Sequence, residues 1–336
     1  MTEPASVIGE FTAESLPTPA EAVRSSPERA RRALWADAAL LLVTAIWGGT
    51  FVMVKDAVAE YPVFGFLALR FGLAALVLLP FVVLRLRSRV FTGGARSRAR
   101  RARKASTPVS WGSLAPLLLG LALFAGYAFQ TTGLALTTPA KAGFITGLGV
   151  VMVPLASAVL LGQPPSRAVW LGVVMATAGL ALLTLDSSLA ANIGDLLVLG
   201  GAASFAVHIL LTGRYAPGHD PLQLLFGQVL TVAALSLVAS LLFETRPGPP
   251  SAQVWFAAAF TGLFATAVAF GVQTVAQRFT TATHTALIFA AEPVFAALFS
   301  FLLIGEVLGP RQLVGCGLIL AGMVAAELGP ARPELV

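Results

Sequence analysis

Charged residues are scarce in this chain of 336 residues: Asp, Glu, Lys and Arg make up 11%, while 57% of the residues are hydrophobic. Soluble domains usually carry about 25% charged and roughly 45–50% apolar residues. So few charges cannot cover so apolar a protein in water, which excludes a soluble globular enzyme. The composition is typical of a membrane-embedded protein. The long, unbroken apolar runs exclude an outer-membrane barrel, whose strands alternate apolar and polar residues.

Cysteine and histidine are almost absent. The single cysteine, Cys316, excludes an intramolecular disulfide and a cysteine-based metal cluster. There are three histidines, His208, His219 and His284, and neither a His-Glu-x-x-His nor a paired-aspartate motif is present. We therefore expect no metal and no cofactor. One alternative is a membrane-embedded transferase-type enzyme, which would need acids, histidines or metal ligands clustered at one membrane depth.

Ten apolar stretches are long enough to cross a bilayer as helices, which needs about 20 residues each. They predict an all-α integral membrane protein with ten transmembrane helices. Their approximate bounds are 38–55, 63–84, 113–133, 140–161, 167–185, 192–212, 222–242, 252–275, 282–304 and 310–328. Residues 1–33 are polar, without a secretory signal, and we expect a disordered cytoplasmic tail there. Residues 329–336 form a short polar C-terminal tail.

Positive charges divide unequally between the predicted loops. If the N-terminus is cytoplasmic, 17 Lys and Arg residues fall inside, nine of them in the basic loop 85–112, and three fall outside. This bias predicts a multi-pass protein of the inner, cytoplasmic membrane with both termini in the cytoplasm. The basic part of this loop, from Arg85 to Lys104, contains one aromatic residue, Phe91. We expect it to contact anionic lipid headgroups rather than nucleic acid.

The sequence repeats itself at an offset of 143 residues. The matching positions are Gln130-Thr131 with Gln273-Thr274, Thr137-Thr138 with Thr280-Thr281, Gly162-Gln163 with Gly305-Glu306, Gly172 with Gly315, and Gly179 with Gly322. A weaker match links the region of Asp37 to that of Asp195. Each half, 34–186 and 187–328, then holds five spans, and because five is odd, the second half enters the membrane from the opposite side. Inverted repeats are typical of secondary transporters, whose substrate site lies between the halves near the midplane.

Several motifs resemble a known family. Ile46-Trp47-Gly48-Gly49-Thr50-Phe51 resembles the Trp-Gly-x-x-Phe motif of the drug/metabolite transporter superfamily. Glu292-Pro293-Val294, followed by Ile304-Gly305-Glu306, resembles the Glu-Pro and Gly-Glu pair of its EamA-like family, and the run from Tyr127 to Gly162 resembles the third and fourth spans. The resemblance covers about 34–328 and departs from the family at Gln163, where the first repeat commonly has Glu.

This resemblance implies a secondary active transporter that works by alternating access. Members of the family move small metabolites such as amino acids, nucleobases and toxic cations, usually with an ion gradient, and efflux is favoured. The expected partners are a small-molecule substrate, membrane lipid and protons as coupling ion. A channel or a scaffold without active transport is the other alternative.

Polar and aromatic side chains inside the spans are the candidate site residues, because ionisable groups at membrane depth usually face a protein interior or a water-filled path. The candidates for substrate binding or transport are Trp47, Tyr127, Gln130, Lys141, His208, Gln273, His284 and Glu292. Structural or conformational roles are expected for Gly48, Gly49, Arg70, Pro293 and Glu306. A buried Arg70 requires a carboxyl or carbonyl partner, which the sequence does not name.

Glu292 is the carboxyl nearest the middle of a predicted span. An apolar setting favours its neutral form, so it can carry a proton or bind a substrate amine; the alternative is that it only braces the helix break at Pro293. His284 takes the place of Lys141 in the repeat, so the two residues either share a pseudo-symmetric location or snorkel at span ends. Gln130 and Gln273 either line a cavity or hydrogen-bond between helices.

Overall fold

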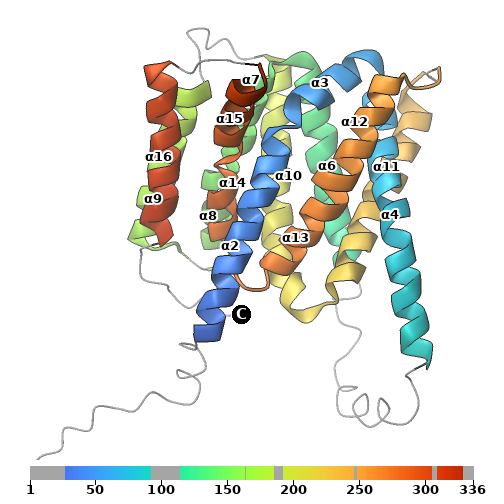
Figure 1. Cartoon of the computed structure of the whole chain (residues 1–336), viewed down its shortest axis with the longest axis horizontal. Helices are drawn as coiled ribbons and strands as arrows, with labels where there is room; N and C mark the ends of the chain where they lie inside the picture. Colours follow the sequence, from blue (N-terminus) through green and yellow to red (C-terminus); the bar gives the residue numbers. More distant parts are fainter. Residues whose placement is uncertain are drawn as a thin grey trace, which may run out of the picture.

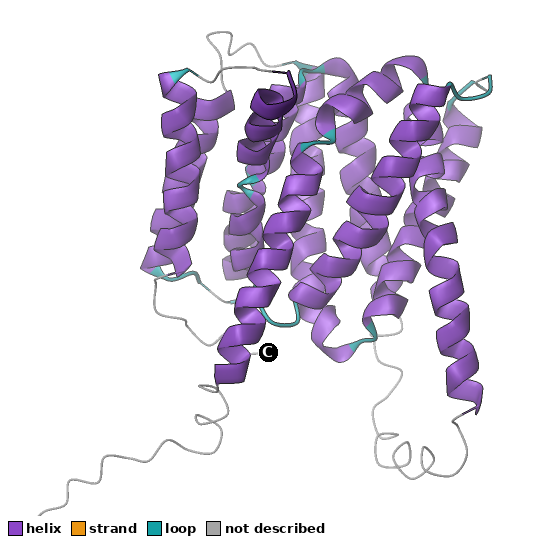
Figure 2. Cartoon of the chain, viewed as in Figure 1, coloured by secondary structure: helices purple, strands orange, loops and turns teal. Residues whose placement is uncertain are grey.

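The structure of the protein is a computed structural model that describes residues 27–91, 114–162, 164–184, 192–245, 248–304 and 309–327. These residues form one bundle of helices joined by short loops, with no strand among them (Figures 1 and 2). The α-helices are α2 (Pro27–Gly48), α3 (Phe51–Glu60), α4 (Val63–Phe91), α6 (Ala115–Leu136), α7 (Pro139–Gly147), α8 (Gly149–Leu161), α9 (Arg167–Thr184), α10 (Ile193–Tyr215), α11 (Pro221–Phe243), α12 (Ala252–Gly262), α13 (Ala269–Ala276), α14 (Ala282–Phe289), α15 (Glu292–Ile304) and α16 (Pro310–Glu327). A 3-10 turn, η2 (Ala216–Gly218), follows α10, and a π-helical segment, η3 (Leu263–Val268), joins α12 to α13.

The described helices account for the ten predicted spans. Seven continuous or nearly continuous segments are long and apolar enough to cross a membrane, and α9 and α16 are shorter apolar helices. The broken pair α14 and α15 makes the remaining span. Large apolar side chains such as Leu76 and Val174, 65% and 62% exposed, point outward at mid-span, where a bilayer supplies their apolar surroundings. The chain is therefore an all-α membrane protein, as predicted.

The ends of two spans differ from the prediction. The first helix begins at Pro27, so residues 27–33 are helical instead of tail, because proline suits the first position of a helix and the following Glu, Arg and Ala are good helix formers. Likewise α4 continues to Phe91, so the beginning of the predicted basic loop extends this helix. The other parts of the predicted tails and basic loop, together with Gln163 and Glu306, lie outside the described residues.

The two halves run through the bundle in opposite directions. In Figure 1, α2 rises from the lower end and α10 descends from the upper one. The packing follows the repeat: α6, the third span, packs on α10, the first span of the other half, while α13 packs on α2. The second spans, α4 and α11, pack on each other, as do the fifth spans, α9 and α16.

Glycines set the spacing of α9 and α16. A Cβ atom built on Gly172 would lie 2.5 Å from the carbonyl oxygen of Gly322, and one on Gly179 would lie 2.6 Å from that of Gly315. Because the repeat relates Gly172 to Gly315 and Gly179 to Gly322, each contact is the symmetry image of the other. The antiparallel crossing thus lies on the pseudo-two-fold relation between the halves, at a distance that only glycine permits.

We expect Gly179→Ala to lower the thermal unfolding temperature in detergent, because its methyl group would meet backbone atoms of α16. Overpacking of this kind costs about 1–3 kcal/mol. Gly317→Ala on the same helix pair is the matched control, since a Cβ there meets nothing within 4 Å. Its unfolding temperature should stay equal or rise, because alanine favours a helix over glycine. Equal loss of stability in both variants would contradict the close-packing argument.

Candidate functional site

A cavity of about 100 Å³ lies between the two halves. Its walls come from the first, second, third and fourth spans of one half and from the sixth, eighth and ninth spans of the other. The polar or aromatic side chains that line it are Trp47, Thr50, Phe51, Arg70, Tyr127, Gln130, Thr131, Thr146, Phe205, His208, Phe270, Gln273, Phe289 and Glu292. Six of the eight predicted transport candidates are among them; Lys141 and His284 are not.

Two of the spans that line the cavity are broken at repeat-related positions. The fourth span is interrupted at Leu148, between α7 and α8, and the ninth at Ala290 and Ala291, between α14 and α15. Leu148 and Ala291 are 143 residues apart. In the ninth span the cause is Pro293, which has no N–H to donate to the preceding turn. Discontinuous helices at corresponding places in two inverted halves are typical of the substrate site of a transporter.

Four aromatic rings form a symmetric wall. Tyr127 and Phe270 are 143 residues apart, and Trp47 and Phe205 have the same separation as Asp37 and Asp195. The ring centroids of Trp47 and Phe270 lie 5.5 Å apart, and those of Phe205 and Tyr127 lie 5.2 Å apart. Each pair is the image of the other. Phe270 was not among the predicted site residues, and the repeat offset from Tyr127 is the signal in the sequence that points to it.

Arg70 lies in this wall and is 3% exposed. Its Nε donates to Oγ1 of Thr266 (2.9 Å), and its Nη2 donates to the hydroxyl of Tyr127 (3.0 Å) and to the carbonyl of Ala265 (3.3 Å). The indole Nε1 of Trp47 donates to the same carbonyl (2.9 Å). Ala265 and Thr266 belong to η3, and a π-helical segment is common at functional sites. The predicted carbonyl partner of Arg70 is therefore present.

Glu292 is the first residue of α15 and the one acid among the residues that line the cavity. It is half-buried, and its carboxyl makes no hydrogen bond or ion pair within the described part of the chain. Gly149 takes its place in the first half, so the repeat supplies one carboxyl and not two. Gly48 lets α2 approach the backbone here: a Cβ on Gly48 would lie 2.6 Å from the carbonyl oxygen of Glu292.

The two repeat-related glutamines both reach the cavity, with different partners. Nε2 of Gln130 donates to Oγ1 of Thr146 (3.0 Å), and Nε2 of Gln273 donates to Oε1 of Gln277 (3.0 Å). Oε1 of Gln273 is buried without a partner among the described residues. Gln130 thus lines the cavity and also links two helices, whereas Gln273 lines the cavity and makes its bond within its own span.

His208 lines the cavity from α10. Its Nε2 hydrogen-bonds Oε1 of Gln228 (2.7 Å), and the amide of Gln228 donates to Oγ1 of Thr274 (3.4 Å). The three residues lie on the sixth, seventh and eighth spans and are all buried. This chain fixes the imidazole at the edge of the cavity.

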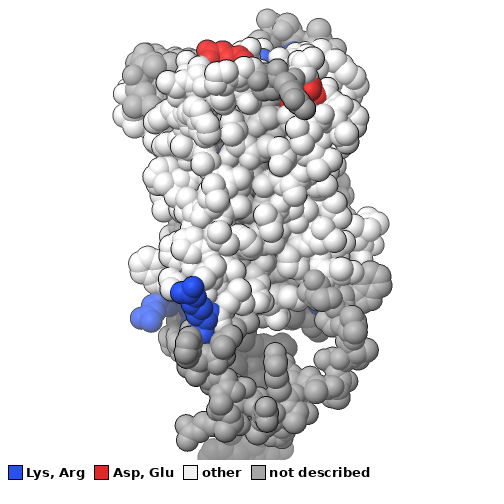
Figure 3. Space-filling view, turned by 90° about the vertical axis from the view of Figure 1, so that its right-hand side faces the viewer, with Lys and Arg blue, Asp and Glu red and all other residues white. Residues whose placement is uncertain are grey.

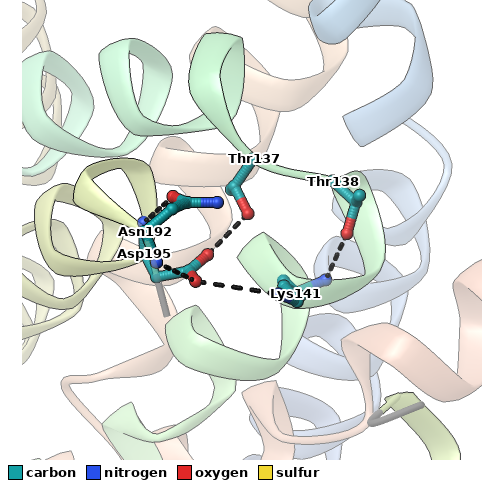
Figure 4. Close-up of polar contacts among 5 residues, drawn as sticks. All are labelled: Thr137, Thr138, Lys141, Asn192 and Asp195. Atoms are coloured by element: carbon teal, nitrogen blue, oxygen red, sulfur yellow. Dashed lines mark hydrogen bonds and ion pairs between the residues drawn. The ribbon is translucent and has the colours of Figure 1, made fainter. Parts of the chain in front are cut away.

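Lys141 lies away from the cavity, in a polar cluster at the upper end of the bundle in Figure 1. Its Nζ is 3.9 Å from Oδ2 of Asp195 (Figure 4). Thr137 donates a hydrogen bond to Oδ1 of the same carboxylate (2.5 Å), and Asp195 and Asn192 form the capping box at the start of α10. Lys141 therefore does not line the cavity, because its side chain turns toward the first helix of the other half.

His284 has the corresponding place at the opposite end. Its Nε2 lies 3.3 Å from Oδ1 of Asp37. The repeat relates His284 to Lys141 and Asp37 to Asp195, so the two ion pairs are images of each other. The expectation of a shared pseudo-symmetric location holds for this pair, but its location is an end of the bundle and not the cavity.

Comparisons with known proteins agree with this architecture. The EamA-like transporter family matches residues 34–185 and again residues 192–326. A protein of Archaeoglobus fulgidus, named an uncharacterized transporter, is 33% identical over 295 residues, which make up 88% of this chain and 86% of the relative. The uncharacterized inner membrane transporter YedA of Escherichia coli (strain K12) is 25% identical over 88% of this chain and 92% of its own.

Of two further matches, one covers only part of the sequence and the other concerns the fold alone. The threonine/homoserine exporter RhtA of Escherichia coli (strain K12) is 31% identical over 185 residues, which make up 52% of this chain and 59% of RhtA. A solved structure described as "Crystal structure of protein" superposes with a TM-score of 0.69 over 89% of this chain and 98% of its own, at 22% identity, and shows the same fold. The protein is a multi-pass membrane transporter and not an enzyme, and it belongs to the EamA-like transporter family.

Proposed function

We propose that the protein exports small polar metabolites, amino acids among them, across the cytoplasmic membrane by alternating access. The observation that carries this proposal is the cavity between two inverted halves, lined by a broken helix from each. Such halves can rock about a fixed central site and expose it to either side in turn. The partial likeness to a threonine/homoserine exporter supports both the substrate class and the direction.

The two repeat-related ion pairs support alternating access. Lys141 with Asp195 joins α7 to α10 at one end, and His284 with Asp37 joins α14 to α2 at the other. Each pair links a broken helix of one half to the first helix of the other half. Opening either end therefore requires one pair to separate while the other stays closed.

Lys141→Ala should open the α7 end more often, because it removes the ion pair there. A partly exposed pair contributes about 1 kcal/mol, which corresponds to a roughly fivefold shift. The measurement is labelling of Ala202→Cys, on the cavity wall, by a membrane-impermeant thiol reagent added from that end, after Cys316 has been replaced. Asp56→Asn, an exposed acid near this end, is the control. Unchanged labelling with Lys141→Ala would contradict the closing role.

The charges of the described residues support the proposed orientation. Figure 3 shows the larger patches of Lys and Arg at one end of the visible face, Asp and Glu with a little Lys or Arg at the other, and an uncharged belt between them. Arginines lie at the lower ends of α2, α4, α9 and α10, whereas Asp56, Glu60 and Glu244 lie at the upper ends of their helices. By the positive-inside rule the lower end is cytoplasmic.

Two single cysteines test this orientation. Gly218 and Gly248 are exposed, in loops at opposite ends, and a Cβ on either meets nothing within 4 Å. In intact cells lacking Cys316, a membrane-impermeant thiol reagent should label Gly248→Cys rapidly and Gly218→Cys only after permeabilisation. The reverse pattern would show that the termini lie outside.

For the coupling step, Glu292 is the proposed proton carrier. A proton and a substrate ammonium group would compete for its one carboxylate, which gives exchange without a second ion site. We expect Glu292→Gln to reach the membrane and to keep the close approach of α2 at Gly48, yet to lose transport driven by a pH gradient in proteoliposomes. Substrate exchange at fixed pH should persist at a weaker substrate affinity, since the glutamine amide still accepts a hydrogen bond from the ammonium group and that step needs no titration.

The controls separate coupling from folding and from channel activity. Asp56→Asn removes a carboxyl outside the cavity and should transport like the wild type. Saturable flux that excess substrate competes away distinguishes a transporter from a channel. Wild-type pH-driven transport in Glu292→Gln would remove this residue as the coupling group.

A further inference from the structure

The positive charge of Arg70 has no counter-charge in the cavity wall. Its partners, Thr266, Tyr127 and the carbonyl of Ala265, are uncharged, and no carboxylate of the described residues lies within 4.0 Å of its guanidinium. A buried charge is costly unless it is paired, and more so inside a membrane. An anionic group that enters the cavity would supply the missing pairing.

Some hydrogen-bond donors of Arg70 are not used within the described part of the protein. All three of its bonds leave from Nε and Nη2, so the two N–H groups of Nη1 have no partner among the described residues. Three polar side-chain atoms of the described residues are fully buried without a hydrogen-bond partner: Asp37 Oδ1, Ser236 Oγ and Gln273 Oε1. Nη1 of Arg70 is not one of them, so it retains some accessible surface. The guanidinium carbon lies 4.6 Å from the ring centroid of Tyr127, which holds the group in place. Its free edge therefore faces the cavity.

Glu292 completes an arrangement of opposite charges. It lines the same cavity from the other half, and its carboxyl is also without a hydrogen bond or ion pair among the described residues. Around the two groups the walls are aromatic or uncharged. The space of about 100 Å³ suits a small molecule. One unpaired cation and one unpaired acid in a cavity whose other lining residues are uncharged match a ligand that carries both charges.

We propose that the cavity binds zwitterions, the substrate carboxylate on Nη1 of Arg70 and the substrate ammonium on Glu292. The inference rests on the proposed transport function and deepens it, because it makes amino acids with uncharged side chains the substrate class. Arg70 is then a specificity-determining residue as well as a link between the second and eighth spans. An amine without a carboxylate leaves Arg70 unpaired, and an acid without an ammonium leaves Glu292 unpaired, so both are rejected.

The test is equilibrium binding to the purified full-length protein at fixed pH. L-amino acids with uncharged side chains are screened by ligand-induced thermal stabilisation. The strongest binder is then compared with its decarboxylated amine and its deaminated acid; for threonine these are 1-amino-2-propanol and 3-hydroxybutyrate. We expect the amino acid to bind at least about tenfold more tightly than either analogue, because each analogue loses one charge-assisted contact.

Variants assign each charge to its residue. Arg70→Gln should abolish the preference for the amino acid over the amine, and Glu292→Gln should abolish the preference over the acid. Thr266→Val is the matched control: it removes one bond of Arg70 but leaves its charge, so stability should fall while the preference stays. If Arg70→Gln does not fold, Arg70→Lys keeps the charge without the planar fork and should retain part of the preference.

The outcomes separate this proposal from the transport function. Equal binding of amino acid and amine by the wild type, or an unchanged preference in Arg70→Gln, overturns the zwitterion site. Saturable flux of a compound that lacks one of the charges, with no binding of any amino acid, overturns the zwitterion site and leaves transport standing. Amino-acid binding with the expected preferences but without any flux supports the site and overturns transport.

Discussion

Inside a bilayer no water is at hand to pair with a free backbone N–H or C=O, so irregular backbone persists only where protein or a cavity surrounds it. Four spans of this bundle leave the regular α-helix: at 49–50, at Leu148, over the π-helical segment and at 290–291. Each irregularity lies at the central cavity or next to it. In the π-helical segment, the carbonyl of Ala265 accepts hydrogen bonds from the side chains of Trp47 and Arg70 of the other half. The irregular backbone thus supplies a hydrogen-bond acceptor between the halves.

Symmetry builds the frame of the cavity, and departures from symmetry supply its chemistry. The crossed glycine contacts, the paired aromatic rings and the two helix breaks all follow the repeat. Glu292, in contrast, corresponds to Gly149 in the other half, so the repeat does not duplicate the acid. The proposed zwitterion site needs one acid and one cation, not two of either. In the proposed mechanism a symmetric scaffold would allow the halves to exchange conformations, while a single pair of charges would give the ligand one orientation.

The polar contacts at the two ends of the bundle differ. At the α7 end, the ion pair of Lys141 is reinforced by Thr137, and Nζ of Lys55 donates to the last carbonyls of α6 at 2.7–3.2 Å. At the α14 end, the corresponding pair of His284 and Asp37 includes a buried oxygen without a well-aligned hydrogen bond. The repeat-related ion pairs thus have different polar neighbours at the two ends.

The sequence by itself determined the ten spans and the inverted halves, because span length, hydropathy and a repeat offset are local or periodic properties of the chain. It also identified Trp47, Gln130, Gln273 and Glu292 as residues that the structure brings to one cavity, since polar or aromatic groups at membrane depth rarely face lipid. Only the tertiary structure placed Lys141 and His284 at the two ends and Arg70 in the cavity wall. The physical reason is that the partner of a side chain depends on how each helix is rotated and on which helix packs against it. Those contacts join residues as distant in the sequence as Asp37 and His284.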